Sequence, residues 1–196
     1  GVRIGLEGAF TPTLKEPGEV LSYIIAAAKG YHMGIGLDCA ASNIKKGKYN
    51  TDFYIKLIKN YPVSFIEDPF SEEDWKDFSE LTKEIGGKVS IIGDDLLTTN
   101  VERMKRARKI KACNGVIIKP NQVGTVSETI EAAKLAKSFG WKIMVSHRSG
   151  ETMDDFIADL AVGVGADLIK AGAPTQKERM VKYNRLLKIE QGLRSA

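Results

Sequence analysis

A lysine that directly follows a short apolar run is the first residue whose placement suggests chemistry. The run Val116-Ile117-Ile118 lies between turn-forming residues, and Lys119 stands at its end. An apolar run this short predicts a buried strand rather than a helix. A lysine at the end of such a strand cannot turn into the apolar interior without a partner or a depressed pKa. Lys119 is therefore a candidate base, with a solvated lysine at a strand exit as the alternative for this strand alone.

The same arrangement recurs, because five other short apolar runs also end in an ionisable residue. The six closing residues follow one another at intervals of 23 to 29 positions, and three acids precede three bases. Such intervals match one βα unit, which takes roughly 25 to 30 residues. The six residues are Asp38, Glu67, Asp94, Lys119, His147 and Lys170.

Helical patterns alternate with these apolar runs. Continuously apolar strands between amphipathic helices predict a parallel sheet covered by helices, and here an α/β (β/α) barrel of the TIM type with about six βα units. Residues 2–8 form a further strand or an extended loop, and Ser71 is expected to cap the helix at 71–85. Strands are expected at 35–37, 64–66, 89–92, 116–118, 143–145 and 167–169, and helices at 17–29, 52–59, 71–85, 100–112, 127–139, 154–164 and 175–191.

The order of the charges suggests a metal site. In a βα barrel the carboxyl ends of the strands meet at one rim, where Asp38, Glu67 and Asp94 would repel one another unless a cation lay among them. Oxygen ligands without histidine or cysteine favour Mg²⁺ over Mn²⁺ or Ca²⁺. A dication there should depress the pKa of Lys119 or Lys170 and move one of them toward a usable base. For each acid alone, a helix cap or a solvated rim charge is the alternative.

Composition indicates one globular domain. The chain has 196 residues, 43% hydrophobic and 28% charged, with a net charge of +4 and no evident linker. No apolar stretch reaches the roughly 20 residues of a membrane span, and no signal peptide is seen. The two cysteines give neither a disulfide framework nor a zinc spacing. We therefore expect a single barrel domain over 1–196 in the cytoplasm, without a membrane partner.

Longer motifs surround the strand-end residues along nearly the whole chain. They are GLDCAAS, SFIEDPF, IIGDDLLTTN, IIKPNQVGT, VSHRSGET, LIKAGAP and ERMVKYNRLLKIE. These motifs resemble the catalytic barrel domain of enolase (phosphopyruvate hydratase), a lyase of glycolysis and gluconeogenesis. This family interconverts 2-phosphoglycerate and phosphoenolpyruvate, so the resemblance implies Mg²⁺ as cofactor and a small phosphorylated acid as substrate. A metal-stabilised carboxylate facing a lysine is an established arrangement of the enolase superfamily.

The resemblance also implies a role for each site residue. Asp38, Glu67 and Asp94 match the metal ligands, and Lys119 matches the base that removes the C2 proton. Lys170 matches the lysine that holds the substrate carboxylate. His147, Arg148 and Ser149 match the run that contacts substrate and phosphate, and a cationic Arg148 beside a hydroxyl suits phosphate on physical grounds as well. Glu7 falls where the family has the acid that assists departure of the hydroxyl.

The chain departs from the family pattern in two respects. Around Glu7 the family usually has GDEGGFAP, whereas this chain has GLEGAFTP, so that Leu6 replaces an acid and Ala9 replaces a glycine. The family's N-terminal domain and first two barrel strands have no counterpart here. We therefore expect an incomplete barrel that is inactive or impaired alone, and that a second copy or a complementing fragment completes.

An alternative to the enzyme stays open. The chain is either an enolase-type enzyme or an inert enolase-derived fragment that acts as a metal-binding or protein- or RNA-interaction module. The expected helix at 100–112 is strongly basic, which is one feature of RNA-binding proteins. Helical spacing places only part of these basic residues on one face, and no aromatic residue lies between them for base stacking. We therefore expect a solvated outer helix of the barrel there, and no nucleic-acid partner.

Overall fold

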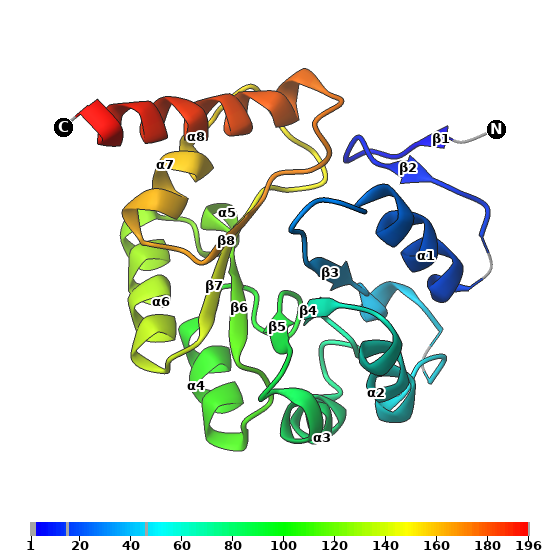
Figure 1. Ribbon diagram of the computed structural model, residues 1–196. Helices are drawn as coiled ribbons and strands as arrows, with labels where there is room; N and C mark the ends of the chain where they lie inside the picture. Colours follow the sequence, from blue (N-terminus) through cyan, green and yellow to red (C-terminus); the bar gives the residue numbers. More distant parts are fainter. Residues whose placement is uncertain (1–2, 15, 46, 196) are drawn as a thin grey trace.

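The computed structural model describes residues 3–14, 16–45 and 47–195. Its main feature is a six-stranded parallel sheet whose strands lie side by side in chain order. The sheet curls, and helices cover its outer side (Figure 1). This architecture is an incomplete (β/α) barrel, which confirms the expected fold class. The strands are β3 (Ile35–Asp38), β4 (Val63–Glu67), β5 (Ser90–Gly93), β6 (Gly115–Ile118), β7 (Lys142–Ser146) and β8 (Leu168–Lys170).

Each helix expected from the sequence is present, with its ends shifted by a few residues. No helix in the described part of the chain combines the length and the apolar character that a membrane crossing needs. The helices are α1 (Pro17–Ala27), α2 (Thr51–Asn60), α3 (Trp75–Ile85), α4 (Val101–Ile110), α6 (Val126–Ser138), α7 (Phe156–Gly163) and α8 (Lys177–Ser195), with the short α5 (Pro120–Val123) and the 3₁₀ helix η1 (Ala41–Asn43).

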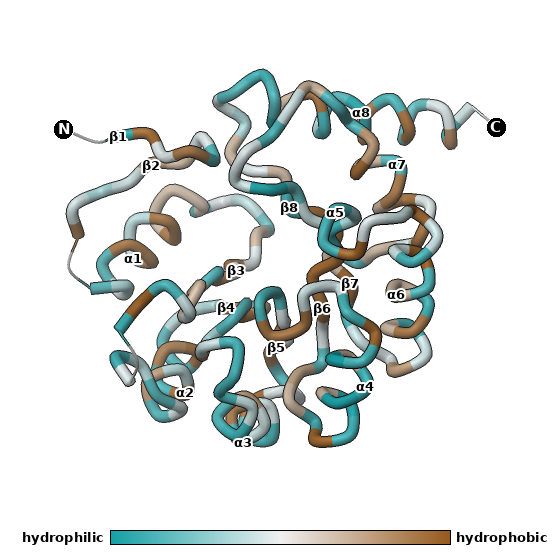
Figure 2. The backbone as a smooth tube through the Cα atoms, turned by 180° about the vertical axis from the view of Figure 1, so that it is seen from behind, coloured by the Kyte–Doolittle hydropathy of each residue, from teal (hydrophilic) through white to brown (hydrophobic). Residues whose placement is uncertain are grey.

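The strands separate two apolar layers. Side chains alternate across a strand, so Val116 and Ile118 pack in the large outer core with the helices, whereas Ile117 between them points inward. Figure 2 shows the hydrophobic character of β6 and β7 at the centre of the molecule. The inner layer is small because the curled sheet encloses little space. It consists of Ile92, Ile117, Met144 and Phe65.

This alternation places the charged residues. The next inward position along a strand comes two residues after the previous one. Charged side chains therefore form the layer directly above the apolar inner layer, at the carboxyl ends of the strands. Phe65, Ile92 and Ile117 are followed two residues later by Glu67, Asp94 and Lys119, and Gly36 and Leu168 by Asp38 and Lys170.

The N-terminal end of α3 differs from the expectation. Ser71 is not its N-cap, because residues 71–74 form a turn closed by the bond from Asp74 N to Ser71 O (2.9 Å), and the helix begins at Trp75. Arg103 of α4 binds this turn through one backbone carbonyl and one carboxylate. Arg103 donates to Glu72 O at 3.0 Å and to Glu73 Oε1 at 2.9 Å. Contacts with α4 thus replace the expected helix cap.

The strand considered at residues 2–8 is much shorter. Residues 1 and 2 lie outside the described residues, and Arg3–Ile4 (β1) pairs antiparallel with Phe10–Thr11 (β2) in a separate two-stranded sheet. Gly5–Ala9 between them is a turn, with Gly5 N bonded to Ala9 O at 2.8 Å. Glu7 therefore lies on a loop and not at the end of a barrel strand.

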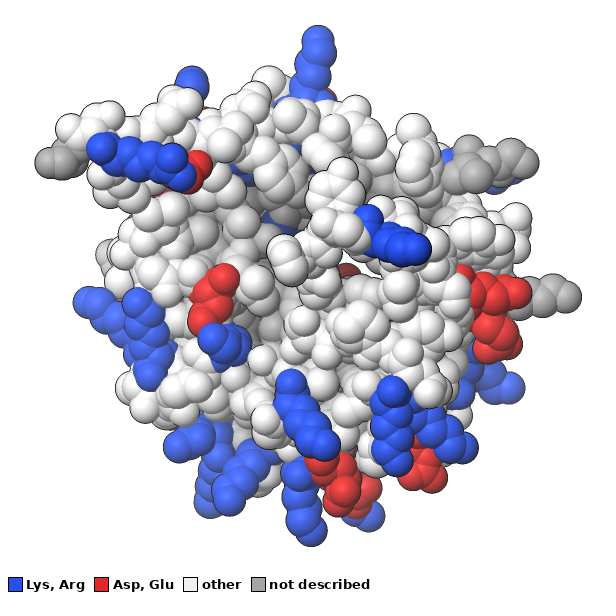
Figure 3. All heavy atoms as spheres, in the orientation of Figure 1, with Lys and Arg blue, Asp and Glu red and all other residues white. Residues whose placement is uncertain are grey.

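The basic helix α4 is part of the outer layer. Arg106 stacks on the Trp75 ring, with its guanidinium carbon 4.0 Å from the ring centroid, and Arg103 Nε donates to Leu96 O at 2.6 Å. Lys and Arg side chains, with acids between them, cover the lower part of the molecule where α2, α3 and α4 lie (Figure 3). Two of the basic side chains of α4 thus stabilise its packing against α3.

Candidate active site

The carboxyl ends of the strands surround a cavity of ≈ 290 Å³. Eight of the nine residues expected to form the site line it, and the ninth, Glu67, is buried and bonded to Lys170. A larger cavity of ≈ 480 Å³ lies between the segment 41–52 and α3 and contains none of the nine. The eight lining residues are Glu7, Asp38, Asp94, Lys119, His147, Arg148, Ser149 and Lys170.

Lys170 at the end of β8 joins the two edge strands of the sheet at this cavity. Its Nζ lies 2.7 Å from Asp38 Oδ2 and 2.9 Å from Glu67 Oε1. Asp38 and Glu67 are themselves paired in register between β3 and β4. Burial alone would lower the pKa of Lys170, but Glu67 and Asp38 raise it above its ordinary value. Lys170 is therefore held as a cation between these two acids.

Lys119 is paired with a different acid. Its Nζ lies 2.5 Å from Asp94 Oδ2, and its backbone N–H is bonded to Thr99 Oγ1 at 3.0 Å. The other carboxylate oxygen, Asp94 Oδ1, is buried and lacks a hydrogen-bond partner among the described residues. A buried carboxylate oxygen without a donor is unfavourable, so this oxygen is available to a ligand.

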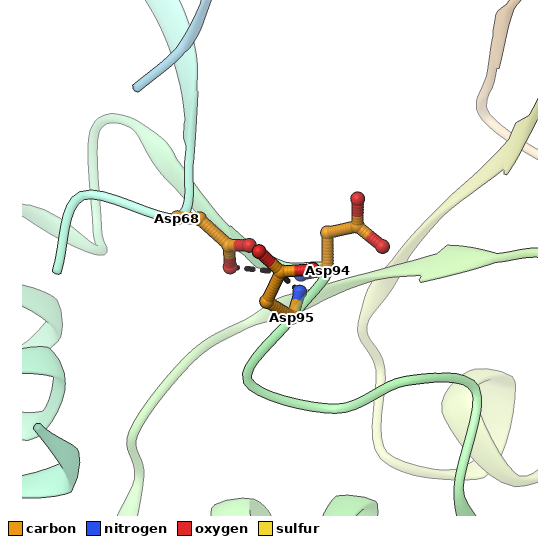
Figure 4. A group of neighbouring side chains, drawn as sticks. All are labelled: Asp68, Asp94 and Asp95. Atoms are coloured by element: carbon orange, nitrogen blue, oxygen red, sulfur yellow. Dashed lines mark hydrogen bonds between the residues drawn. The ribbon is translucent and has the colours of Figure 1, made fainter. Parts of the chain in front are cut away.

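Asp94 belongs to a group of three carboxylates that the sequence analysis did not assemble. One oxygen from each of Asp68, Asp94 and Asp95 lies within 4.8 Å of the others. The Asp68 carboxylate accepts bonds from Asp94 N at 2.9 Å and from Asp95 N at 2.7 Å, as Figure 4 shows. Only Asp94 is shared with the expected set of Asp38, Glu67 and Asp94. The doubled acids in SFIEDPF and IIGDDLLTTN were the available signal.

These acids are held in surroundings that disfavour their charged forms. Burial raises the pKa of Glu67 to about 7, although Lys170 lowers it. Burial also raises the pKa of Asp68 to about 8, against the two backbone N–H groups that lower it. Closely spaced carboxylates together with the unpaired Asp94 Oδ1 are a set of hard oxygen donors. They fit a hard divalent cation.

His147 is buried beside Glu7. Its Nε2 lies 3.5 Å from Glu7 Oε2, and Ser149 Oγ donates to Glu7 Oε1 at 3.1 Å. Burial lowers the pKa of His147 to about 4, Glu7 acts in the opposite direction, and Arg179 lowers it further. His147 is therefore neutral at pH 7. Arg148 is exposed, and its Nη1 donates to Asn121 Oδ1 at 2.8 Å.

The loop that carries Glu7 is held through its backbone. Ala173 N donates to Glu7 O at 2.9 Å, and Thr175 Oγ1 donates to Gly8 O at 2.6 Å. Gly8 has φ +79°, and a Cβ there would lie 2.5 Å from Thr175 Oγ1, so this position requires glycine. Leu6 is 80% exposed and Ala9 is also exposed. The side chains at the two departures from the family motif thus face solvent, whereas backbone contacts of Glu7 and Gly8 hold the loop.

Comparison with known proteins places the chain in a family. A family model described as "Enolase, C-terminal TIM barrel domain" matches residues 45–196. Enolase B of Dictyostelium discoideum is 48% identical over 218 residues, covering 97% of this chain and 49% of the relative. Enolase 2 of Hevea brasiliensis is 46% identical over 215 residues, covering 97% and 48%. Enolase of Solanum lycopersicum is 44% identical over 217 residues, covering 98% and 49%.

The chain spans about half the length of the curated relatives it matches. The family model describes the same architecture that the six-stranded sheet and its helices form. The chain belongs to the enolase family, in the part that forms its C-terminal TIM barrel domain.

Proposed function

We propose that this chain forms the catalytic barrel of a cytoplasmic, Mg²⁺-dependent enolase of glycolysis and gluconeogenesis, which interconverts 2-phosphoglycerate and phosphoenolpyruvate. The observation that carries this proposal is the placement of two lysines opposite several carboxylates in one cavity of ≈ 290 Å³. Removal of a proton alpha to a carboxylate needs a base on one side and positive charge around the carboxylate on the other. Lys119 after β6 and Lys170 at the end of β8, with β7 between them, supply these two requirements.

Lys119 is the proposed base for the C2 proton. As a base it accepts this proton in its neutral form. Asp94 lies 2.5 Å from its Nζ and pairs with the charged form that results. The abstracted proton is therefore held at Lys119 Nζ until the reaction reverses or the product leaves.

Lys170 is the proposed partner of the substrate carboxylate. Its neighbours raise its pKa, which keeps it positively charged at neutral pH. Because Asp38 and Glu67 already hold its Nζ in place, Lys170 needs little reorganisation when negative charge develops on the substrate.

The phosphate and the leaving hydroxyl are assigned to the opposite part of the cavity. Arg148 and Ser149 offer a guanidinium and a hydroxyl to the phosphate, which suits charge-assisted hydrogen bonding. Glu7 is the proposed acid that gives a proton to the departing C3 hydroxyl, and His147 and Ser149 orient its carboxylate.

Asp38, Glu67 and Asp94 are the proposed ligands of Mg²⁺, with Asp68 and Asp95 next to Asp94. When bound, the ion would supply positive charge against the negative charge that develops on the substrate carboxylate. Asp94 Oδ1, buried and without a hydrogen-bond partner among the described residues, supports this assignment.

We also propose that the open seam between β3 and β8 is covered by a second copy or by a complementing fragment. The two strands are the edges of the sheet, and in the described structure their backbones are not paired with each other. Tyr23 on α1 and Leu168 on β8 are among the exposed large apolar residues. Unpaired strand edges and exposed apolar groups favour association.

Formation of phosphoenolpyruvate from 2-phosphoglycerate tests the proposed function. Absorbance is followed with Mg²⁺, first with this chain alone and then with a purified fragment that supplies the other half of a relative such as Enolase B. We expect turnover in at least the complemented sample, and none when the chain carries Lys119→Ala. Absence of turnover in both wild-type samples would contradict the proposal.

A further inference from the structure

Arg179 on α8 is one of the largest fully buried side chains, with 2% of its surface exposed. A guanidinium has five N–H donors in a fixed planar arrangement, and each of the five has an acceptor here. Nε bonds Gln176 Oε1 at 3.4 Å. Nη1 bonds His147 Nδ1 and Arg148 O, the latter at 2.8 Å. Nη2 bonds Leu6 O at 3.2 Å and Ser149 O at 2.7 Å.

The acceptors are unusual for a buried cation. They are three backbone carbonyls, a side-chain amide oxygen and a ring nitrogen, and no described carboxylate forms an ion pair with Arg179. Lys182, three residues further along α8 and equally buried, does have a counter-ion, Glu151 Oε2 at 2.7 Å. A buried cation without a counter-ion is costly. Packing alone therefore does not explain why position 179 has a buried cation without a counter-ion.

The contact with His147 fixes the protonation of the ring. Arginine stays protonated in proteins and can only donate hydrogen bonds. His147 Nδ1 must therefore accept, so the proton of the neutral ring is on Nε2. Nε2 is the nitrogen that faces Glu7 Oε2 at 3.5 Å.

The carbonyl contacts fix the backbone on both sides of that pair. Arg179 bonds the residue before Glu7 and the two residues after His147. Gly172 lets this side chain approach, since a Cβ there would lie 2.7 Å from Arg179 Cδ. One buried side chain thus connects two loops, residues 6–8 and 147–149, that are far apart in the sequence.

We propose that Arg179 is a positioning residue that holds His147 as the Nε2–H tautomer, with that N–H turned toward the Glu7 carboxylate. The proposal rests on the proposed function only where it names Glu7 as the acid of the reaction. The tautomer and its cause follow from the contacts of Arg179. The other charged groups around His147 are Glu7, Lys170 and Glu151, and none of the three bonds Nδ1.

Nitrogen NMR of protein labelled with ¹⁵N-histidine tests this directly. The chain has two histidines, and the exposed His32 serves as an internal reference for the buried His147. At neutral pH we expect His147 to show a protonated Nε2 and an unprotonated Nδ1 in long-range ¹H–¹⁵N correlations. A protonated Nδ1 in the wild-type protein, alone or in a doubly protonated ring, would overturn the proposal without any variant.

Three variants separate positioning from packing. Arg179→Met should lose the single-tautomer pattern, because Nδ1 loses its donor. Arg179→Lys, which keeps a cationic donor, should retain it at least in part. Lys182→Met, which removes a buried cation that does not touch His147, should leave the pattern unchanged.

A folded Arg179→Met protein with wild-type His147 signals would also overturn the proposal. If Arg179→Met does not fold, the proposal is tested by the spectra of Arg179→Lys and of the wild type. Loss of the Nε2–H pattern in Arg179→Lys would then contradict it. The NMR readout needs no substrate. Failure of turnover with the tautomer intact would therefore count against the proposed function alone.

Discussion

Lys170 Nζ and Asp38 Oδ2 lie 2.7 Å apart although the two residues are 132 positions apart in the chain. They stand on the first and last strands of the sheet, whose backbones are not paired with each other in the described structure. This ion pair, together with the bond from Lys170 to Glu67, connects the two edges of the curled sheet at the candidate active site. The same side chain thus contributes to the shape of the barrel and to the charge of the site.

Removal of Lys170 should therefore destabilise the fold. In Lys170→Met the buried Glu67, 1% exposed, loses its counter-ion and must stay charged without a partner or take up a proton, and removal of one partner from such a buried pair costs about 3 kcal/mol. Lys142→Met is the matched control, because Lys142 pairs with Asp167 at 2.6 Å on the surface, where such pairs contribute about 0.5 kcal/mol. Urea unfolding at pH 7 compares the two variants. Equal losses would show that the buried pair does not stabilise the barrel.

The loop that carries Glu7 gives a second prediction. Restoring the family motif with Leu6→Asp and Ala9→Gly should change the free energy of unfolding by less than about 0.5 kcal/mol, because both side chains are exposed. Gly8→Ala should cost about 1–3 kcal/mol, since it introduces a Cβ at positive φ against Thr175. Thermal unfolding of both variants measures these two changes in the free energy of unfolding. A larger loss in the Leu6→Asp, Ala9→Gly protein than in Gly8→Ala would contradict the backbone anchoring of Glu7.

The pH dependence of stability should carry a contribution from His147. Its pKa falls from 6.5 to about 4 on folding, so between these values the unfolded state binds more protons than the folded state. Stability from this group is therefore fully present above about pH 6.5 and is lost as the pH falls toward 4, by up to about 3 kcal/mol.

His147→Gln removes this titratable group. Glu67 and Asp68, whose pKa values are also shifted, are present in both the variant and the wild type. Urea unfolding at pH 7 and pH 4.5 should show a smaller loss in His147→Gln than in the wild type. The same loss in both proteins would mean that His147 is not kept neutral by the fold.

Metal binding distinguishes the ligand set expected from the sequence from the carboxylate group found in the structure. Asp94 belongs to both sets, so Asp94→Asn should weaken Mg²⁺ binding at least tenfold in calorimetric titration. Asp38→Asn should weaken binding if the strand-end set holds the ion, and Asp95→Asn should do so if the group around Asp68 holds it. Glu73→Gln, on the outer surface beside Arg103, is the control. Unchanged affinity in Asp94→Asn would remove the metal site from this account.

The barrel and most of the site could be predicted because two short-range rules determine them. Apolar runs of three or four residues mark the strands, and the residues two positions after the inner layer, such as Asp94 after Ile92 and Lys119 after Ile117, must point to the same side. The sequence pattern therefore places the strand-end residues together without long-range information.

The remaining features depend on contacts between distant segments. Ser71 has the residue type of a helix cap, but Arg103 on α4 bonds the Glu72 carbonyl and the Glu73 carboxylate in the turn that follows it. Asp68 belongs to the acidic group because its carboxylate bonds the backbone of the next strand end. Arg179 is a basic residue in a helical pattern, and only the fold shows that it is buried against His147. None of these contacts leaves a periodic pattern in the sequence.

Whether Lys119 removes the C2 proton can be measured by the exchange of that proton with deuterated solvent. The exchange is followed by NMR of 2-phosphoglycerate with Mg²⁺, using this chain complemented with the other half of a relative. We predict exchange in the wild type, no detectable exchange with Lys119→Ala, and residual exchange with weakened substrate binding in Lys170→Ala. Wild-type exchange in Lys119→Ala, or complete loss only in Lys170→Ala, would contradict the assignment of the base.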